Sequence, residues 1–372
     1  MTFKKINAWF HLWLGLASGI VVFVLGITGC ILVFEQEIKS MTSPWLHAEK
    51  PDGGKYLPPS VLVNSLQKQV PGKEIESIWY HGEGRTAHLN MHESDSTAYV
   101  NPYTAEVVAL VDHEDIFHFF KDGHYYLWFP KEIGHYVTGW GTLIFFLLLI
   151  SGLILWWPKR WNKKGRDQSF KIRWRAKFKR VNYDLHNVLG FYSIILALIF
   201  AFTALMMSFT WFNNGVYWMA GGKNKPRLEA VSDTTTNIRS NVMVQVDKAW
   251  HKGIHEIAEH NPLEILMHFP EKASEAIYVC TDMFNGTWRD VYLDQYTLRE
   301  LPASNKRVRD EDLASWIRRY NYGLHVGLVG GLPVKIIYFL ASLICASLPV
   351  TGFYIWWGKK KKSAKKTKPR VI

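Results

Sequence analysis

Residues 11–34 read HLWLGLASGIVVFVLGITGCILVF, an apolar stretch that opens with a histidine and then carries no charge. The mean hydropathy of the whole chain, −0.06, hides such segments. Four windows of 22 to 25 residues contain no charged side chain: Leu12–Phe34, Tyr136–Trp157, Val188–Phe212 and Ile336–Trp357. Each is long enough to cross about 30 Å of hydrocarbon. The first is too long for a signal-peptide core and has no small-residue cleavage site behind it. The sequence therefore predicts a helical membrane protein with four spans.

Basic residues predict how these spans are oriented. Two lysines, Lys4 and Lys5, precede the first span. The loop from Lys159 to Arg180 holds eleven Lys/Arg against one Asp, and the tail after Trp357 holds eight and no acid. Because positive loops stay in the cytoplasm, we expect both termini and this loop to lie inside. Topology and contact with lipid headgroups account for these basic runs, so nucleic-acid binding is not expected.

The two long segments outside the membrane share one pattern. Residues 59–69 and 241–251 have the spacing of short amphipathic helices, and three alternating, strand-like stretches follow each of them. These stretches are Glu76–Gly82, Thr86–Glu93 and Thr97–Leu110 in the first segment, and Leu263–Phe269, Glu275–Thr281 and Thr287–Leu301 in the second. The last stretch of each contains Tyr-Thr, at 103–104 and 296–297, at the expected turn. We expect a small α+β module that is present twice.

The spans repeat as well. His11-x-x-x-Gly15 recurs as His186-x-x-x-Gly190, 175 residues later, and SGLILWWPKR at 151–160 resembles TGFYIWWGKK at 351–360, 200 residues later. Parallel repeats of this kind imply a pseudo-two-fold axis along the membrane normal. Such an axis brings His11 toward His186 on one side of the bundle and His124 toward His325 on the other.

Paired histidines among packed helices suit the axial ligation of a b-type haem, and ionisable residues at membrane depth indicate a functional site. The glycines one turn after His11 and His186 would let a flat macrocycle lie against the helix. His124 and His325 each precede their span and would reach the membrane face on a short interfacial helix. His135, at the start of the second span, is a rival ligand or a contact for propionate or substrate, although its repeat partner is Lys335. The alternative for each histidine is a simple interfacial role. The three cysteines, Cys30, Cys280 and Cys345, form no metal or disulfide motif.

The chain resembles the PepSY-associated transmembrane family of iron-regulated bacterial inner-membrane proteins over nearly its full length. The segments that carry the resemblance are His11-Leu-Trp-Leu-Gly15, Gly26-Ile-Thr-Gly29, His124-Tyr-Tyr-Leu-Trp128, Ser151-Gly152-Leu-Ile-Leu-Trp-Trp-Pro158, Tyr183-Asp-Leu-His186-Asn-Val-Leu-Gly190 and the stretch His325-Val-Gly-Leu-Val-Gly-Gly-Leu-Pro333. Members of this family that act as ferric-siderophore reductases have four spans, paired PepSY modules and two bis-histidine haems. The resemblance implies one haem held by His11 and His186 inside, and one held by His124 and His325 outside, with His135 as the alternative outer ligand.

The expected fold is thus a membrane α-helical protein, a four-helix transmembrane bundle with internal duplication, plus two small external α+β (PepSY-like) modules. The expected segments are span one (1–35), periplasmic module one (36–112), interfacial helix and span two (113–158), a basic cytoplasmic loop (159–181), span three (182–213), periplasmic module two (214–310), interfacial helix and span four (311–358) and a basic cytoplasmic tail (359–372).

The expected function is a di-haem b oxidoreductase of the bacterial inner membrane that passes electrons to periplasmic ferric siderophores and releases Fe(II). Bis-histidine iron lacks an open position, which favours electron transfer over oxygen binding. The chain has no dinucleotide fingerprint, so a quinol or a cytoplasmic reductase must donate the electrons. No catalytic side chain beyond the ligands is singled out. The alternatives are a b-type cytochrome subunit that serves a separate partner, and a haem-free PepSY protein that binds peptides or regulates a protease.

Overall fold

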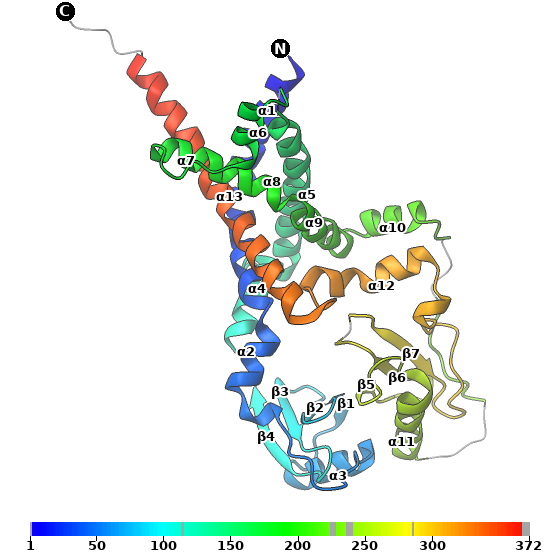
Figure 1. Ribbon diagram of the computed structural model, residues 1–372. Helices are drawn as coiled ribbons and strands as arrows, with labels where there is room; N and C mark the ends of the chain where they lie inside the picture. The colour runs from blue at the N-terminus through cyan, green and yellow to red at the C-terminus, as the bar shows by residue number, and fades with distance from the viewer. Residues whose placement is uncertain are drawn as a thin grey trace, which may run out of the picture. The chain divides into compact units, whose positions relative to one another are not determined.

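The computed structural model describes residues 2–112, 115–158, 160–223, 228–235, 241–284 and 286–366 of the chain (Figure 1). The last residues of the expected basic tail, 367–372, lie outside this description. The chain divides into two compact units, and each unit draws on both halves of the sequence. A helical unit comprises Met1–Glu35, Ile116–Gly215 and Leu324–Ile372, and an α+β unit comprises Gln36–Asp115 and Val216–Gly323.

Three long helices form the frame of the helical unit. They are α1 (Phe3–Leu32), α5 (Lys131–Trp156) and α13 (Gly331–Lys366). Each contains a stretch long and apolar enough to cross a membrane. Helix α1 packs against both α5 and α13, as Figure 1 shows. Three of the four predicted spans are therefore present as single helices.

The third predicted span is not one straight helix. It consists of α7 (Phe178–Asp184), a π-helical turn (Leu185–Leu189), α8 (Gly190–Tyr192) and α9 (Ile194–Ser208), with a bend of 64° after α8. The bend falls at Ser193, whose hydroxyl bonds to the carbonyl of Gly190 at 3.4 Å. A hydroxyl that bonds back to its own helix, next to a wide π-turn, is a common cause of such bends. The third predicted span is thus bent, and the helical unit has four spans only if this bent pair is counted as one.

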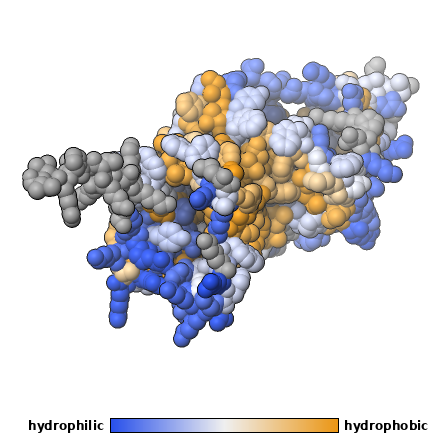
Figure 2. Space-filling model, turned by 90° about the horizontal axis from the view of Figure 1, so that it is seen from above, coloured by the Kyte–Doolittle hydropathy of each residue, from blue (hydrophilic) through white to orange (hydrophobic). Residues whose placement is uncertain are grey.

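Hydrophobic side chains cover much of the helical surface. In the space-filling view of Figure 2 they form broad patches. Ile195 is 71 % exposed, Trp140 55 % and Leu340 52 %. Large apolar side chains on the outside of a helix bundle, rather than in its interior, are expected where the surrounding solvent is lipid.

Short helices join the long ones. Helix α4 (Ile116–Tyr126) precedes α5 and packs against α1 and α5, and α12 (Leu313–Val326) precedes α13. Both expected connecting helices are therefore present. The break after α4 is made at Leu127 and Trp128, both with positive φ. The remaining helical elements are α2 (Glu35–Thr42), α6 (Lys163–Phe170), α10 (Thr210–Met219), 3-10 turns at Pro44–Leu46 and Val308–Asp310, and a π-helical turn at Gly253–Ile257.

The α+β unit is built on one antiparallel sheet of the order β4-β3-β2-β1-β5-β6-β7. The strands are β1 (Ile75–His81), β2 (Ala87–Met91), β3 (Ser96–Val100), β4 (Val107–Asp112), β5 (Glu264–His268), β6 (Ile277–Thr281) and β7 (Arg289–Leu293). Helices α3 (Pro59–Gln69) and α11 (Val242–Lys252) confirm the two predicted amphipathic helices. An α+β module present twice was expected, and the pairing of β1 with β5 joins the strands of both modules into one sheet. This pairing removes two edges that would otherwise expose unpaired backbone groups.

The core of the α+β unit lies between one face of this sheet and the two helices. Alternate residues of each strand point into it, for example Ile78 and Tyr80 of β1, and Leu62 and Trp250 contribute from α3 and α11. The pattern is the period of two that a half-buried strand requires. The sheet therefore forms a single core from residues of both modules.

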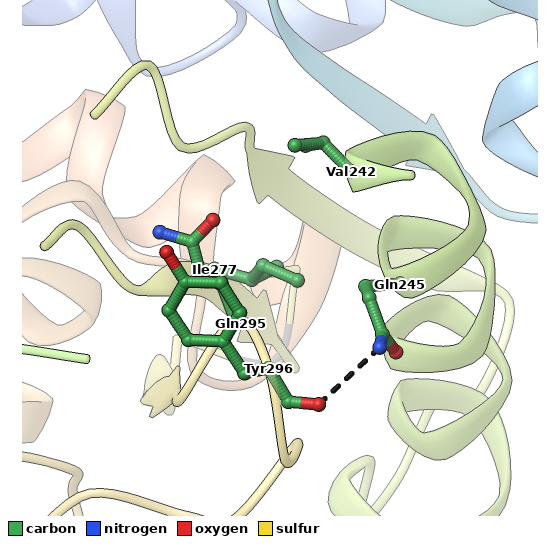
Figure 3. Close-up of a pocket in the computed structure, with 5 residues that line it drawn as sticks. All are labelled: Val242, Gln245, Ile277, Gln295 and Tyr296. Atoms are coloured by element: carbon green, nitrogen blue, oxygen red, sulfur yellow. Dashed lines mark hydrogen bonds between the residues drawn. The ribbon is translucent and has the colours of Figure 1, made fainter. Parts of the chain in front are cut away.

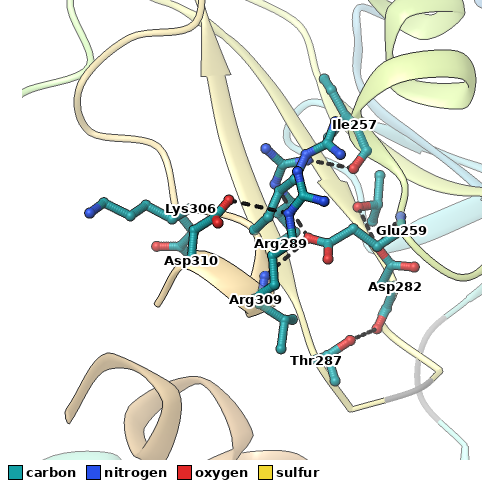
Figure 4. Close-up of polar contacts among 12 residues, drawn as sticks. Ile257, Glu259, Asp282, Thr287, Arg289, Lys306, Arg309 and Asp310 are labelled. Carbon is teal, nitrogen blue, oxygen red and sulfur yellow. Dashed lines mark hydrogen bonds and ion pairs between the residues drawn. The ribbon is translucent and has the colours of Figure 1, made fainter. Parts of the chain in front are cut away.

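A buried ionic network stabilises the second module (Figure 4). The buried side chain of Arg289 donates to the carbonyl of Ile257 at 2.6 Å, and its Nε lies 3.9 Å from Glu259. Arg319 on α12 pairs with Glu311, which lies just before this helix, at 3.1 Å, and both side chains are almost fully buried. Buried charges of this kind are tolerated only when they are paired.

Candidate functional site

His11 and His186 lie next to each other inside the helical unit. His11 belongs to the first third of α1, and His186 to the π-helical turn that follows α7. Their ring centroids are 6.4 Å apart, and the ring planes are at 89°. The first pairing that the sequence predicts is thus present as a spatial pair.

Each of these rings is held by a hydroxyl. Nδ1 of His11 lies 2.6 Å from Oγ of Ser151 on α5, and Nδ1 of His186 lies 2.9 Å from Oγ1 of Thr351 on α13. The next residue on each of these helices is a glycine. A Cβ on Gly152 would lie 3.3 Å from Cε1 of His11, and the value is the same for Gly352 and His186. These glycines let the imidazoles approach the neighbouring helix.

His124 and His325 form a second pair. His124 is near the end of α4, and His325 is near the end of α12. Their ring centroids are 6.2 Å apart, with the planes at 55°. Nδ1 of His124 lies 2.9 Å from Oγ1 of Thr28 on α1, and Nδ1 of His325 lies 2.8 Å from Oγ1 of Thr203 on α9. Because Thr28 lies on α1 and Thr203 on α9, these two histidines are held against apolar helices of the helical unit.

His135 is placed differently. It lies in the first turns of α5, and its Nε2 lies 3.1 Å from the backbone carbonyl of Ser208. Its ring contacts Tyr136. The structure thus brings His124, rather than His135, to His325.

The supporting contacts follow the numbering of the sequence repeat. Thr203 comes 175 residues after Thr28, the separation of His11 from His186, and Thr351 comes 200 residues after Ser151. The repeat could have revealed two of these hydroxyls, because Thr203 follows His186 at the same separation as Thr28 follows His11. They were not predicted, because serine and threonine are common in membrane helices.

The backbone carbonyls of Ser151 and Thr351 also accept equivalent hydrogen bonds in the two halves of the chain. Asn7 donates to the carbonyl of Ser151 at 3.0 Å, and Asn182 donates to that of Thr351 at 3.0 Å. The two asparagines are again 175 residues apart. They fix the ends of α1 and α7 to the helices that carry the hydroxyls.

The spacing of each histidine pair fits one metal between two rings. A metal–imidazole bond of about 2 Å places the metal roughly 3 Å from the ring centroid, so two opposed rings have centroids about 6 Å apart. The measured separations are 6.4 and 6.2 Å. In the described part of the chain, Nε2 of these four histidines makes no hydrogen bond with the protein. The donor set is therefore the one that a bis-histidine haem requires.

A bare metal ion suits these positions less well. Among the described residues there is no group of three or more His, Cys, Asp or Glu side chains that could hold a metal. Two imidazoles leave an octahedral ion with four positions to fill, and a porphyrin supplies those four nitrogens itself. The residues present thus fit a haem better than an ion held by protein ligands alone.

Two other features of the structure were considered as parts of a site. Arg180 pairs with the fully buried Asp184 at 2.8 Å. The recess between α11 and the sheet, lined by Val242, Gln245, Ile277, Gln295 and Tyr296 (Figure 3), has room for about one water molecule. It is too small for an iron chelate.

A family model described as the PepSY-associated TM region matches residues 8–359. The match covers nearly the whole chain, and all four paired histidines fall within it. A comparison with curated proteins gives no match. The chain belongs to the PepSY-associated TM region family.

Proposed function

We propose, with membership of this family as the premise, that the protein is a di-haem b-type membrane oxidoreductase that reduces ferric siderophores. The observation that supports it best is the presence of two histidine pairs whose ring centroids are separated by the span of one metal and its two imidazole bonds. His11 with His186 would hold one haem, and His124 with His325 the other.

A haem iron held by two imidazoles carries one electron at a time and has no open position for oxygen or substrate. The protein's own task is then to hold the ligands, to keep water from the bundle and to bring an acceptor near. A ferric chelate suits such an acceptor, because reduction to Fe(II) weakens its oxygen ligands and releases the metal. The electron comes from a quinol or a cytoplasmic reductase, since the chain carries no dinucleotide fingerprint.

The repeated contacts and the charge distribution support a topology for this activity. We propose that the chain is an internal duplication that forms a four-helix bundle in the bacterial inner membrane, with the bent pair α7–α9 as one span. The eleven basic residues of the loop at 159–180 keep that loop and both termini in the cytoplasm. The α+β unit is then periplasmic, where a ferric siderophore arrives.

The experiment has two arms. Purified protein is reduced with dithionite, and the difference spectrum is expected to show the α-band of b-type haem. The reduced protein is then mixed anaerobically with a panel of ferric siderophores while a chromogenic chelator traps Fe(II). Reoxidation with stoichiometric Fe(II) supports the reductase. A spectrum without haem contradicts the whole proposal, and reduced haem that no ferric siderophore reoxidises leaves an electron-transfer subunit.

Single substitutions assign the ligands. His11→Ala and His186→Ala are each expected to remove one haem and leave the other. His124→Ala is expected to remove the second haem, while His135→Ala retains both, because His135 bonds to a backbone carbonyl instead of facing His325. Loss of a haem in His135→Ala with retention in His124→Ala would transfer the outer ligand to His135.

A further inference from the structure

Each of the four paired histidines has its Nδ1 on a hydroxyl group, and all four hydroxyls come from membrane helices. We propose that these hydroxyl residues are positioning residues that fix the histidine tautomer and ring orientation needed for iron binding, an inference that rests on the proposed function. The hydroxyl set consists of Ser151, Thr351, Thr28 and Thr203.

The single proton of each hydroxyl already has an acceptor. Oγ1 of Thr28 donates to the carbonyl of Val24 at 2.8 Å, and Oγ1 of Thr203 donates to that of Ile199 at 2.6 Å. Ser151 and Thr351 likewise donate to carbonyls three or four residues earlier on their own helices. A hydroxyl that already donates its hydrogen to a carbonyl offers only lone pairs to a further partner. The imidazole Nδ1 must therefore be the donor.

A backbone carbonyl at His186 leads to the same assignment. The carbonyl of Leu348 lies 3.1 Å from Nδ1 of His186. A carbonyl can only accept, so Nδ1 carries the hydrogen in the neutral ring. The proton-free nitrogen is then Nε2, which is the atom available to iron.

The hydroxyl contacts connect helices within each half of the chain. In the first half, α1 supplies His11 and receives His124 at Thr28, while α5 supplies Ser151 to His11. In the second half, the bent span supplies His186 to Thr351 of α13, and Thr203 of α9 contacts His325 of α12. Each histidine pair, in contrast, takes one ring from each half. The rings are thus oriented within their own half before a metal joins the two halves.

Neutral acceptors also affect the electronic character of the ligand. A partner on Nδ1–H increases the basicity of the coordinating nitrogen and so favours ferric over ferrous iron. A hydroxyl does this less than a carboxylate, because it carries no charge to attract the proton. Loss of the hydroxyl should free the ring to rotate, weaken haem binding and raise the midpoint potential of that haem only.

The test uses the full-length protein in detergent with Thr28→Val, Thr203→Val, Ser151→Ala and Thr351→Val. Ser18→Ala is the matched control, because Ser18 is buried on α1 and donates to the carbonyl of Leu14 in the same way. The measurements are haem affinity by titration of the apoprotein, the two midpoint potentials by redox titration, and the ferric low-spin EPR signals, which respond to ligand-plane orientation.

We expect haem affinity at the affected site to fall about 10- to 100-fold. The potential of that haem should rise and its EPR signal should change, whereas the other haem and Ser18→Ala stay as in the wild type. Thr28→Ser, which keeps the hydroxyl, should restore all three. Two haems with unchanged affinity, potentials and EPR in every valine or alanine variant would overturn the inference while leaving the proposed function intact. Equal effects in Ser18→Ala would also overturn it. Wild-type protein that binds no haem refutes the proposed function itself.

Discussion

Helices α1 and α13 approach closely at Gly26, which makes this glycine a sensitive test of the packing. An added Cβ would lie 2.8 Å from Cβ of Ala346 and 3.0 Å from its Cα and N. Carbon atoms pack at about 3.5–4.0 Å, so α1 and α13 would have to separate by roughly 0.7 Å or more. The neighbouring hydrogen bond from Ser342 Oγ to the carbonyl of Gly26, at 3.0 Å, would be stretched as well.

These effects give a net cost for Gly26→Ala. Overpacking costs about 1–3 kcal/mol, and the hydrogen bond contributes about 1 kcal/mol. Alanine recovers about 1 kcal/mol of helix propensity. We therefore expect Gly26→Ala to destabilise the protein by about 1–3 kcal/mol. Gly19 is the matched control, because a Cβ there would meet only Cβ of Pro349 at 3.4 Å. Gly19→Ala should be neutral or stabilising by up to about 1 kcal/mol.

The assay is reversible unfolding of the detergent-solubilised protein by increasing SDS mole fraction, followed by far-ultraviolet circular dichroism. Wild type, Gly26→Ala and Gly19→Ala are compared under one condition. A lower midpoint for Gly26→Ala alone supports the packing of α1 on α13. Equal midpoints for the two alanine variants would show that the helices do not meet at Gly26, and would refute the reasoning.

Two further predictions concern the α+β unit. Arg319→Met leaves the buried Glu311 without its partner and should destabilise the unit by about 3–5 kcal/mol in a thermal melt. Lys50→Met, which breaks an exposed ion pair, should cost at most about 1 kcal/mol in the same assay. Equal melting temperatures for the two variants would contradict this prediction. Burial raises the pKa of Glu264 to about 7 from 4.5, against the opposing hydrogen bond from the backbone N–H of Phe284. The folded state therefore holds this proton more tightly than the unfolded state. Stability should fall as the pH rises from about 4.5 to 7, and Glu264→Gln should flatten that profile and be more stable at pH 8 by on the order of 3 kcal/mol. Hydrogen exchange of the β5 amides measures it, and a parallel profile in the variant would exclude Glu264 as the cause.

Local sequence patterns were sufficient to predict much of the fold. Uncharged windows located α1, α5 and α13, and amphipathic spacing located α3 and α11. These features depend on neighbouring residues, which the sequence displays directly. The pairing of β1 with β5 was not predictable in this way, because it joins edges that are far apart in the chain. The bend at Ser193 was missed because hydropathy does not register backbone geometry.

The candidate site was likewise only partly predictable from the sequence. Repeat spacing predicted the pairs His11 with His186 and His124 with His325, and each pair is close in space. The residues that hold them were not predicted. A serine such as Ser151 resembles any other serine within a membrane helix until the helices are assembled, since its role depends on a contact with α1.

The number of haems per chain tests the central claim most directly. Pyridine haemochrome analysis, combined with amino-acid quantification of the same purified sample, gives this ratio. We expect two b-type haems per chain, one for each histidine pair. A ratio of one would mean that one histidine pair holds no haem, and a ratio of zero in protein that was purified from haem-replete cells would contradict the proposed function.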